Sequence, residues 1–277
     1  MLVLDGNASN LRFFYGKDVA KAYGSQVGLL LRLLVSLRAS GTSLPVHVLV
    51  SGYRVPAVEA RLATLGVTIL EPDAAPPVRV PAWGSKWARS SFAKLRVLAL
   101  TRFRWVLLLD TDSIVLSSLD HLPAAADGPA FVFGYKCFPR RELRASTAVL
   151  RPSDDAWRRA SQLLDEPGTA IYDDLGEGSV WRHLWPKAFE LPISYAALRV
   201  SDLSAAEWAK VHVLHDPNLL RKASRAGFRE ARVAERLKDL EEATGRESAR
   251  LNISALLRAA TPERRGRGKR KTQRRGK

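Results

Sequence analysis

The segment Val106 to Leu116, VLLLDTDSIVL, constrains the fold and the function of this chain more than any other part of it. The four consecutive apolar residues at 106–109 predict a buried strand. Asp110 and Asp112 follow directly, and side chains two residues apart on an extended chain point to the same side. The pattern therefore predicts two carboxylates that project together beyond the carboxyl end of a central strand, the edge where open α/β sheets bind ligands.

Strands and helices alternate over most of the chain. Short apolar runs predict further strands at 46–50, 67–70, 131–133 and 148–150. Helical periodicity marks residues 28–38, 56–65 and 90–102, and the Pro-rich stretch 72–81 predicts a loop. Strand–helix–strand units of this size need crossover connections. We therefore expect an α/β fold with a mostly parallel central sheet flanked by helices.

The composition changes toward the C-terminus. Residues 219–260 are charged and helical in pattern, with few Gly or Pro, so we expect a helical extension outside a sheet domain of residues 1–218. Residues 262–277 hold nine Lys or Arg, one Glu and no apolar residue. Such a segment repels itself and cannot bury surface, so we expect a disordered basic tail over 261–277. The tail is either a solubilising segment, an arm that binds a polyanion, or a nuclear-import signal.

Composition and charge exclude several classes of protein. A single cysteine, Cys137, excludes an intramolecular disulfide framework and a zinc site built on several thiolates. No apolar run approaches the ~20 residues that cross a bilayer, so we expect no transmembrane segment. The start MLVLDGN lacks a basic region, which favours a cytoplasmic location over the secretory lumen. The net charge of +16 suits acidic ligands such as nucleotide diphosphates.

The paired aspartates are typical of a metal site. Two close carboxylates repel each other, and a divalent cation relieves that repulsion. Oxygen ligands suit Mn²⁺ or Mg²⁺, and the cation can in turn hold a diphosphate. The alternative is a turn in which the aspartates cap a helix, because Asp-Thr-Asp-Ser is also good capping chemistry. The pattern alone leaves both interpretations open.

Residues 92–122 closely resemble the glycogenin-like family 8 of retaining glycosyltransferases. The family's K-L pair, D-x-D motif, apolar run and D-x-L segment are matched without a gap by Lys94-Leu95, Asp110-x-Asp112, Ile114-Val115-Leu116 and Asp120-x-Leu122. Weaker similarities cover Ser36-Leu37-Arg38, Ala148 to Ser153, and Leu191-Pro192-x-x-Tyr195. The resemblance implies a single GT-A, Rossmann-like domain with a C-terminal helical extension.

The chain also departs from the family pattern. Where the family has N-S-G, this chain has Arg144-Ala145-Ser146, and Gly176-Glu177-Gly178-Ser179 stands where the family has G-D-Q-G. The late H-x-x-G-x-x-K-P-W becomes His215-x-x-Asn218, followed by Arg221-Lys222 without Pro-Trp. The metal-binding half of the pattern is intact, while the half that contacts sugar and acceptor is altered.

The resemblance assigns roles to the matched residues. It implies that Asp110, Asp112 and His215 converge as ligands of Mn²⁺, with His212 as the competing histidine. Lys94 would act on the donor phosphate or sugar, and Glu177 would replace the family's Asp beside the donor sugar. The structural alternatives are a surface lysine on an amphipathic helix and a surface acid in a loop.

Further residues are implied to contact the nucleotide. Tyr23 and Gln26 stand near the position of the family's uridine-stacking tyrosine, and Thr111 lies between the two aspartates. Arg221 and Lys222 would neutralise the leaving phosphate, since cations stabilise charge that develops during transfer.

The expected function is metal-dependent transfer of a hexose from a nucleotide sugar, UDP-linked, to the hydroxyl of an unidentified acceptor, with retention. One alternative is a haloacid-dehalogenase-type phosphotransferase, because LLLDTDSIV resembles its aspartyl-nucleophile strand, although the upstream βα units are then unexplained. The other is a non-catalytic descendant that binds a nucleotide sugar or a polyanion.

Overall fold

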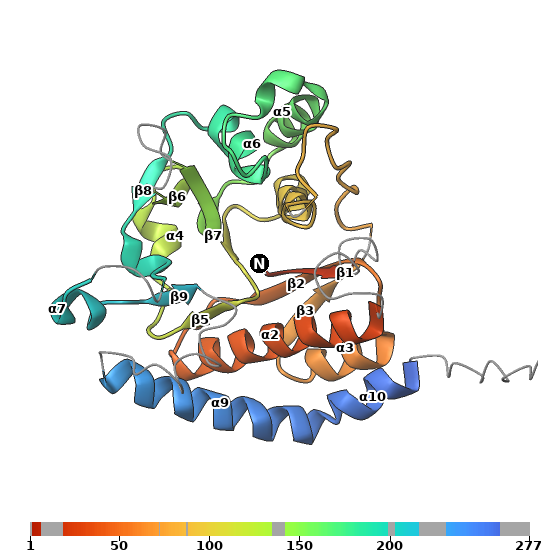
Figure 1. Cartoon of the computed structure of the whole chain (residues 1–277), viewed down its shortest axis with the longest axis vertical. Coiled ribbons are helices and arrows are strands. Elements are labelled where there is room, and N and C mark those ends of the chain that lie inside the picture. The colour runs from red at the N-terminus through yellow and green to blue at the C-terminus, as the bar shows by residue number, and fades with distance from the viewer. Residues whose placement is uncertain are drawn as a thin grey trace, which may run out of the picture.

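The computed structural model describes residues 2–6, 19–71, 73–86, 88–134, 142–198, 203–215 and 231–260. Its centre is a seven-stranded sheet in the order β3-β2-β1-β4-β7-β6-β8 (Figure 1). The strands in chain order are β1 (Leu2–Gly6), β2 (Val46–Gly52), β3 (Val67–Leu70), β4 (Val106–Leu109), β6 (Ala130–Gly134), β7 (Glu142–Leu150) and β8 (Phe189–Leu191). Each predicted strand lies within one of them.

The sheet is mostly parallel, as predicted. β3, β2, β1 and β4 pair parallel to one another, and β6 pairs parallel with β8. β7 reverses the direction, because it pairs antiparallel with both β4 and β6. The carboxyl end of β4 is therefore flanked by the first half of β7, which extends past it.

Helices cover both faces of the sheet because side chains alternate along each strand. In β4, Leu107 and Leu109 face one cluster, and Leu108 faces the other. The first cluster includes α2 (Val19–Ala39) and α3 (Pro56–Ala63). The second includes η1 (Ser91–Ala99), α5 (Asp154–Asp165) and α6 (Glu177–Leu184), on the opposite side of the sheet (Figure 1).

Two of the predicted helices differ in extent or type. α2 begins at Val19, nine residues before the predicted start at 28. The segment predicted as a helix over 90–102 is a shorter 3₁₀-helix, η1. In η1 the Arg96 guanidinium is buried and donates to the carbonyls of Ala75 and Pro76 in the Pro-rich loop. We attribute the tight winding to these tertiary contacts, which local periodicity does not register.

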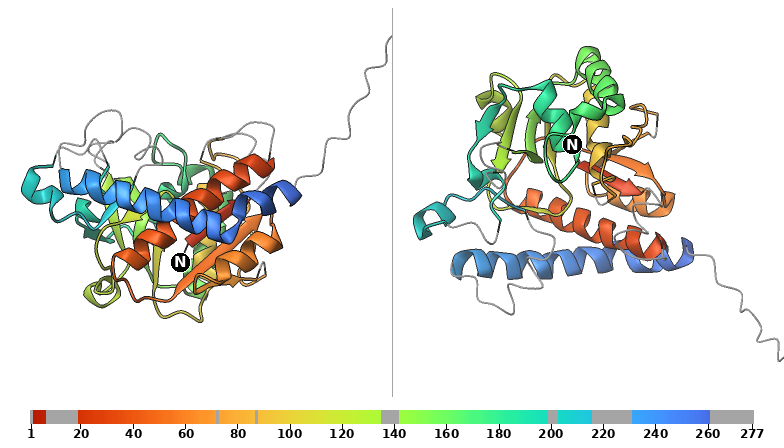
Figure 2. Two further views of the ribbon diagram at one scale, coloured as in Figure 1. Left: turned by 90° about the horizontal axis from the view of Figure 1, so that it is seen from below. Right: turned by 45° about the horizontal axis from the view of Figure 1, so that its top comes forward.

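The C-terminal helices form an outer layer over α2 (Figures 1 and 2). They are α9 (Ala231–Leu251) and α10 (Ile253–Ala260), so the predicted helical character is confirmed for residues 231–260. The first part of the predicted extension, 219–230, and the predicted basic tail, 261–277, lie outside the described residues. Their apolar residues Val233, Leu237, Leu240, Leu251 and Ile253 are buried in the same cluster as α2 and the sheet. The described part of the extension is thus packed on the core of the sheet domain.

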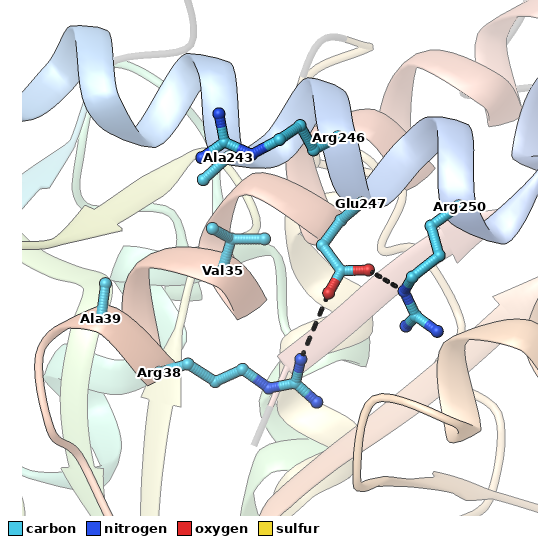
Figure 3. Close-up of a pocket in the computed structure, with 7 residues that line it drawn as sticks. All are labelled: Val35, Arg38, Ala39, Ala243, Arg246, Glu247 and Arg250. Atoms are coloured by element: carbon cyan, nitrogen blue, oxygen red, sulfur yellow. Dashed lines mark hydrogen bonds and ion pairs between the residues drawn. The ribbon is translucent and has the colours of Figure 1, made fainter.

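Figure 3 shows a surface hollow at the seam between α2 and α9. Val35, Ala39 and Ala243 contribute apolar lining, and Glu247 lies between Arg38 and Arg250, at 3.8 and 2.6 Å. The hollow contains no residue that the sequence singles out for function. None of the helices in the described ranges is both long enough and apolar enough to cross a bilayer.

A two-stranded ribbon lies beside the main sheet. It pairs β5 (Ser113–Val115) antiparallel with β9 (Val213–His215), so Ser113 lies opposite His215. The Ser36 hydroxyl of α2 accepts a hydrogen bond from the Val115 N–H, which ties the ribbon to the helix layer. The remaining short helices within the described residues are α4 (Leu122–Ala125), η2 (Pro167–Thr169), η3 (Ile193–Tyr195) and α7 (Ala205–Trp208).

Candidate functional site

Asp110 and Asp112 lie in the tight turn that joins β4 to β5. The Ser113 N–H donates to the Asp110 carbonyl at 3.0 Å, and the Asp110 N–H donates to the Ser146 carbonyl of β7 at the same distance. No helix begins at this turn, because strand β5 starts at Ser113. The alternative that the aspartates cap a helix is therefore wrong.

The β5–β9 ribbon places His215 beside both aspartates. The His215 Nε2 atom lies 3.5 Å from an Asp110 carboxylate oxygen and 3.3 Å from one of Asp112. One ligand atom from each of the three residues lies within 4.8 Å of the others. The expected convergence of the three residues is confirmed, and two carboxylates with one imidazole nitrogen form a donor set that suits Mn²⁺. Metal binding itself stays a prediction.

His212, the competing histidine, has other neighbours. Its Nδ1 atom lies 2.6 Å from the Ser117 hydroxyl, and its ring stacks on Tyr195 with 4.6 Å between the ring centroids. The Tyr195 hydroxyl in turn lies 2.6 Å from Nε2 of His121. His212 thus belongs to an aromatic cluster at the other end of the ribbon, so His215 is the histidine beside the aspartates.

Lys94 connects Asp110 to Glu177. Its Nζ atom lies 2.7 Å from an Asp110 oxygen and 3.2 Å from Glu177 Oε1. The exposed fractions of the Lys94 and Glu177 side chains are 17% and 12%. The alternatives of a surface lysine and a surface acid are therefore wrong. Glu177 is the first residue of α6, so a cation from η1 and an anion from α6 meet at the end of β4.

The charges of the site stabilise one another. Burial alone would raise the pKa of Asp110, but the Lys94 ammonium and the hydrogen bond with His215 lower it to about 2. Burial opposes the charge of Lys94, yet Asp110 and Glu177 raise its pKa above the ordinary value. Burial would also lower the pKa of His215, but its hydrogen bonds with Asp110 and Asp112 raise it to about 10. Without a metal, two cations thus neutralise the aspartates.

A second group of charged residues lies next to Glu177. The sequence did not single it out as a site. Burial raises the pKa of Glu142, and the nearby carboxylates of Asp174 and Glu177 raise it further, while Arg144 opposes them. The Arg144 guanidinium lies 3.6 Å from Glu142. No motif marks Glu142 or Asp174. Arg144 was visible only as a departure from the N-S-G pattern.

The residues expected to contact the nucleotide differ in their distance from the aspartates and in their exposure. The Thr111 hydroxyl lies 3.4 Å from the Gln26 side-chain oxygen, so α2 reaches the turn that holds Asp110 and Asp112. Tyr23 is fully buried, with its ring edge-on to Tyr53 at 5.3 Å. The expected contact of Tyr23 with the nucleotide is therefore not supported, because its ring is enclosed in the core. Arg221 and Lys222 lie outside the described residues.

The sequence matches no known family model and no curated protein. Solved structures do resemble the fold. An active-site mutant of LgtC superposes with a TM-score of 0.55 at 16% identity, over 87% of this chain and 95% of that one. The galactosyltransferase LgtC in complex with donor and acceptor sugar analogues gives 0.50 with the same identity and coverage.

The apo structure of the bifunctional glycosyltransferase WbbM gives a TM-score of 0.53 at 14% identity. It covers 77% of this chain, which spans 45% of the length of WbbM. These likenesses establish the architecture: a mixed α/β domain with a central sheet between helix layers. The chain has a GT-A glycosyltransferase fold.

Proposed function

We propose that this protein is a metal-dependent glycosyltransferase that moves a hexose from a nucleotide sugar, UDP-linked, to an acceptor hydroxyl with retention. The observation that carries the proposal is the meeting of Asp110, Asp112 and His215 at the carboxyl end of β4. The likeness of the fold to glycosyltransferases supports it over the phosphotransferase alternative.

Each charged residue has a task in this proposal. Asp110, Asp112 and the His215 Nε2 atom would hold Mn²⁺ or Mg²⁺, which as a Lewis acid would stabilise the leaving diphosphate. Lys94 lies beside Asp110, where an ammonium group can interact with a phosphate oxygen of the donor. Glu177 would lie beside the sugar, since Lys94 joins it to Asp110.

The proposed reaction exchanges one bond at the anomeric carbon. The bond to the diphosphate oxygen breaks, and the acceptor oxygen forms a bond on the same face of the sugar. The acceptor proton passes to the leaving diphosphate. This route needs no protein nucleophile. Glu177 is held in an ion pair with Lys94, which favours an electrostatic role for it.

The test combines binding and turnover. We expect Mn²⁺ together with UDP to raise the melting temperature, and one member of a panel of UDP-sugars to be hydrolysed or transferred in the presence of Mn²⁺. Asp110→Asn and Asp112→Asn should each lower the rate by at least about a hundredfold, because a buried charge-assisted ligand is lost.

Asp127→Asn is the matched control, since Asp127 is exposed and lies outside the site. Unchanged Mn²⁺-dependent stabilisation in both site variants would refute the metal site. Stabilisation by UDP and Mn²⁺ without turnover of any donor would instead favour a non-catalytic nucleotide-sugar-binding protein.

A further inference from the structure

Leu175 has a backbone conformation that leucine rarely adopts. Its φ angle is +51°, and the other non-glycine residue with positive φ in the described ranges is Asn252, between α9 and α10. Asparagine tolerates the left-handed region, whereas an ordinary side chain pays about 1–2 kcal/mol there. Leu175 lies two residues before Glu177. Strain of this kind persists only where neighbouring contacts hold the backbone in place.

Ser85, from the loop before η1, makes those contacts. Its N–H donates to the Leu175 carbonyl at 3.1 Å, and its hydroxyl donates to the Asp174 carbonyl at 2.7 Å. The same hydroxyl accepts the Ala88 N–H at 3.2 Å, which orients it toward Asp174. One serine therefore holds two consecutive carbonyls of the loop that leads into α6.

The start of α6 fits its surroundings closely. A Cβ atom at Gly176 would lie 3.1 Å from an Asp174 carboxylate oxygen and 3.3 Å from the Cβ of Ala88. A Cβ at Gly178 would lie 3.0 Å from the Leu143 carbonyl of β7. The two glycines flank Glu177, and the missing side chains at these positions let α6 lie close to both the Ser85 loop and β7.

The contacts form one path from Ser85 to the turn that holds Asp110 and Asp112. Ser85 holds the backbone at 174 and 175, Glu177 begins the helix, and Lys94 joins Glu177 to Asp110. We propose that Ser85 is a positioning residue, which keeps Leu175 in its strained conformation and thereby keeps Glu177 against Lys94. This inference rests on the proposed glycosyltransferase function, because the relevant output is the rate of transfer.

The experiment is a double-mutant cycle of Ser85→Ala and Leu175→Gly. Ser85→Ala should lower kcat by about tenfold or more, since two hydrogen bonds of its hydroxyl are lost. Binding of Mn²⁺ and UDP should stay unchanged, because Asp110, Asp112 and His215 are untouched. Leu175→Gly should be near wild type in kcat, because glycine adopts positive φ without strain. In the double variant kcat should recover to within about threefold of Leu175→Gly alone.

Ser91→Ala is the matched control. Its hydroxyl donates to the Ala88 carbonyl at 2.6 Å in the same segment but does not contact the 172–176 loop. This variant should keep the wild-type kcat. A purely structural role for Ser85 would lower stability and Mn²⁺–UDP binding together, whereas positioning lowers kcat while binding is kept.

Several outcomes would overturn the proposal: an unaffected kcat in Ser85→Ala, a large loss in Leu175→Gly, or a double variant no better than Ser85→Ala. If Ser85→Ala does not fold, the double variant decides, and it must be folded and active. The melting temperatures of the same four proteins give a readout independent of turnover, and Leu175→Gly should reduce the destabilisation by Ser85→Ala. A wild-type protein inactive on every donor refutes the proposed function, while the melting temperatures still test whether Ser85 holds Leu175 in its strained conformation.

Discussion

In the proposed metal site, His215 would couple cation binding to the release of a proton. Its imidazole lies between two carboxylates, and its pKa is raised to about 10, so in the metal-free protein it is charged at neutral pH. Only the neutral ring can bind a metal. A cation that enters the site must therefore displace a proton from His215, and metal affinity should rise with pH.

We predict that binding of Mn²⁺ at pH 7.5 releases about one proton. Calorimetric titration in two buffers of different ionisation enthalpy measures this number directly. In His215→Gln the release should vanish and the affinity should fall by about tenfold or more. Binding by the wild-type protein without proton release would contradict the assignment of His215.

The raised pKa of His215 also predicts that the metal-free protein becomes less stable as the pH rises. The folded pKa of His215 is above the ordinary value of 6.5, so its contribution to stability is fully present below pH 6.5. That contribution is lost as the pH rises through about 10. His215→Gln should flatten the decline over this window, which denaturant titrations at several pH values can follow.

At the scale of residues, the sequence allowed only part of the site to be predicted. Asp110 and Asp112 follow from their spacing after a strand, because period-two geometry is local. His215 could be distinguished from His212 only through a family resemblance, since a ribbon formed by distant segments brings it to the aspartates. Ser85 and Glu142 carried no signal, because their importance lies in partners about 35 to 90 residues away.

At the scale of elements, continuous apolar runs were predicted well. β3 and β4 have the predicted bounds, because four buried residues between loops identify a core strand. β7 has 9 residues, whereas the sequence predicted only the three residues 148–150 as a strand. Residues 142–147, ELRAST, lack an apolar run, and their extended form comes from pairing with β4 and β6. That half of β7 carries Glu142 and Arg144 past the end of β4, so its polarity suits the site it lines.

The packing of α9 gives a prediction at this scale. Leu237 is 1% exposed, in the cluster shared by α2 and the sheet. Leu237→Ala should lower the free energy of unfolding by about 3 kcal/mol, because it removes buried methyl groups and leaves a cavity. Urea denaturation measures the loss, and the exposed Lys238→Ala is the control. Equal stabilities of the two variants would show that α9 is not part of the cooperative unit.

At the scale of the whole molecule, a large part of the positive charge lies in a C-terminal segment that has no residues for a core. The chain has a net charge of +16, and nine of its 44 Lys and Arg residues fall in 262–277. A segment without apolar residues contributes little to a core. Its effect on the protein should therefore be electrostatic.

We predict that deletion of residues 262–277 leaves the melting temperature and the Mn²⁺–UDP thermal shift nearly unchanged. The truncated chain should elute from a heparin column at lower salt, because counterion release drives binding to polyanions. A fall in melting temperature of more than about 5 °C would indicate that the segment packs on the domain. Unchanged elution would assign polyanion binding, if any, to the folded part.

The β5–β9 ribbon has a consequence for how the protein is made. Asp110 and His215 are about a hundred residues apart in the chain, and the last helices cover the first one described. Contacts of such sequence separation form late, because a long loop must close before they are gained. During synthesis the three side chains cannot meet until residue 215 has left the ribosome. A nascent chain would therefore complete most of its core strands before the predicted cation site, and add α9 and α10 only afterwards. A cation would then stabilise late states of the domain rather than its early intermediates.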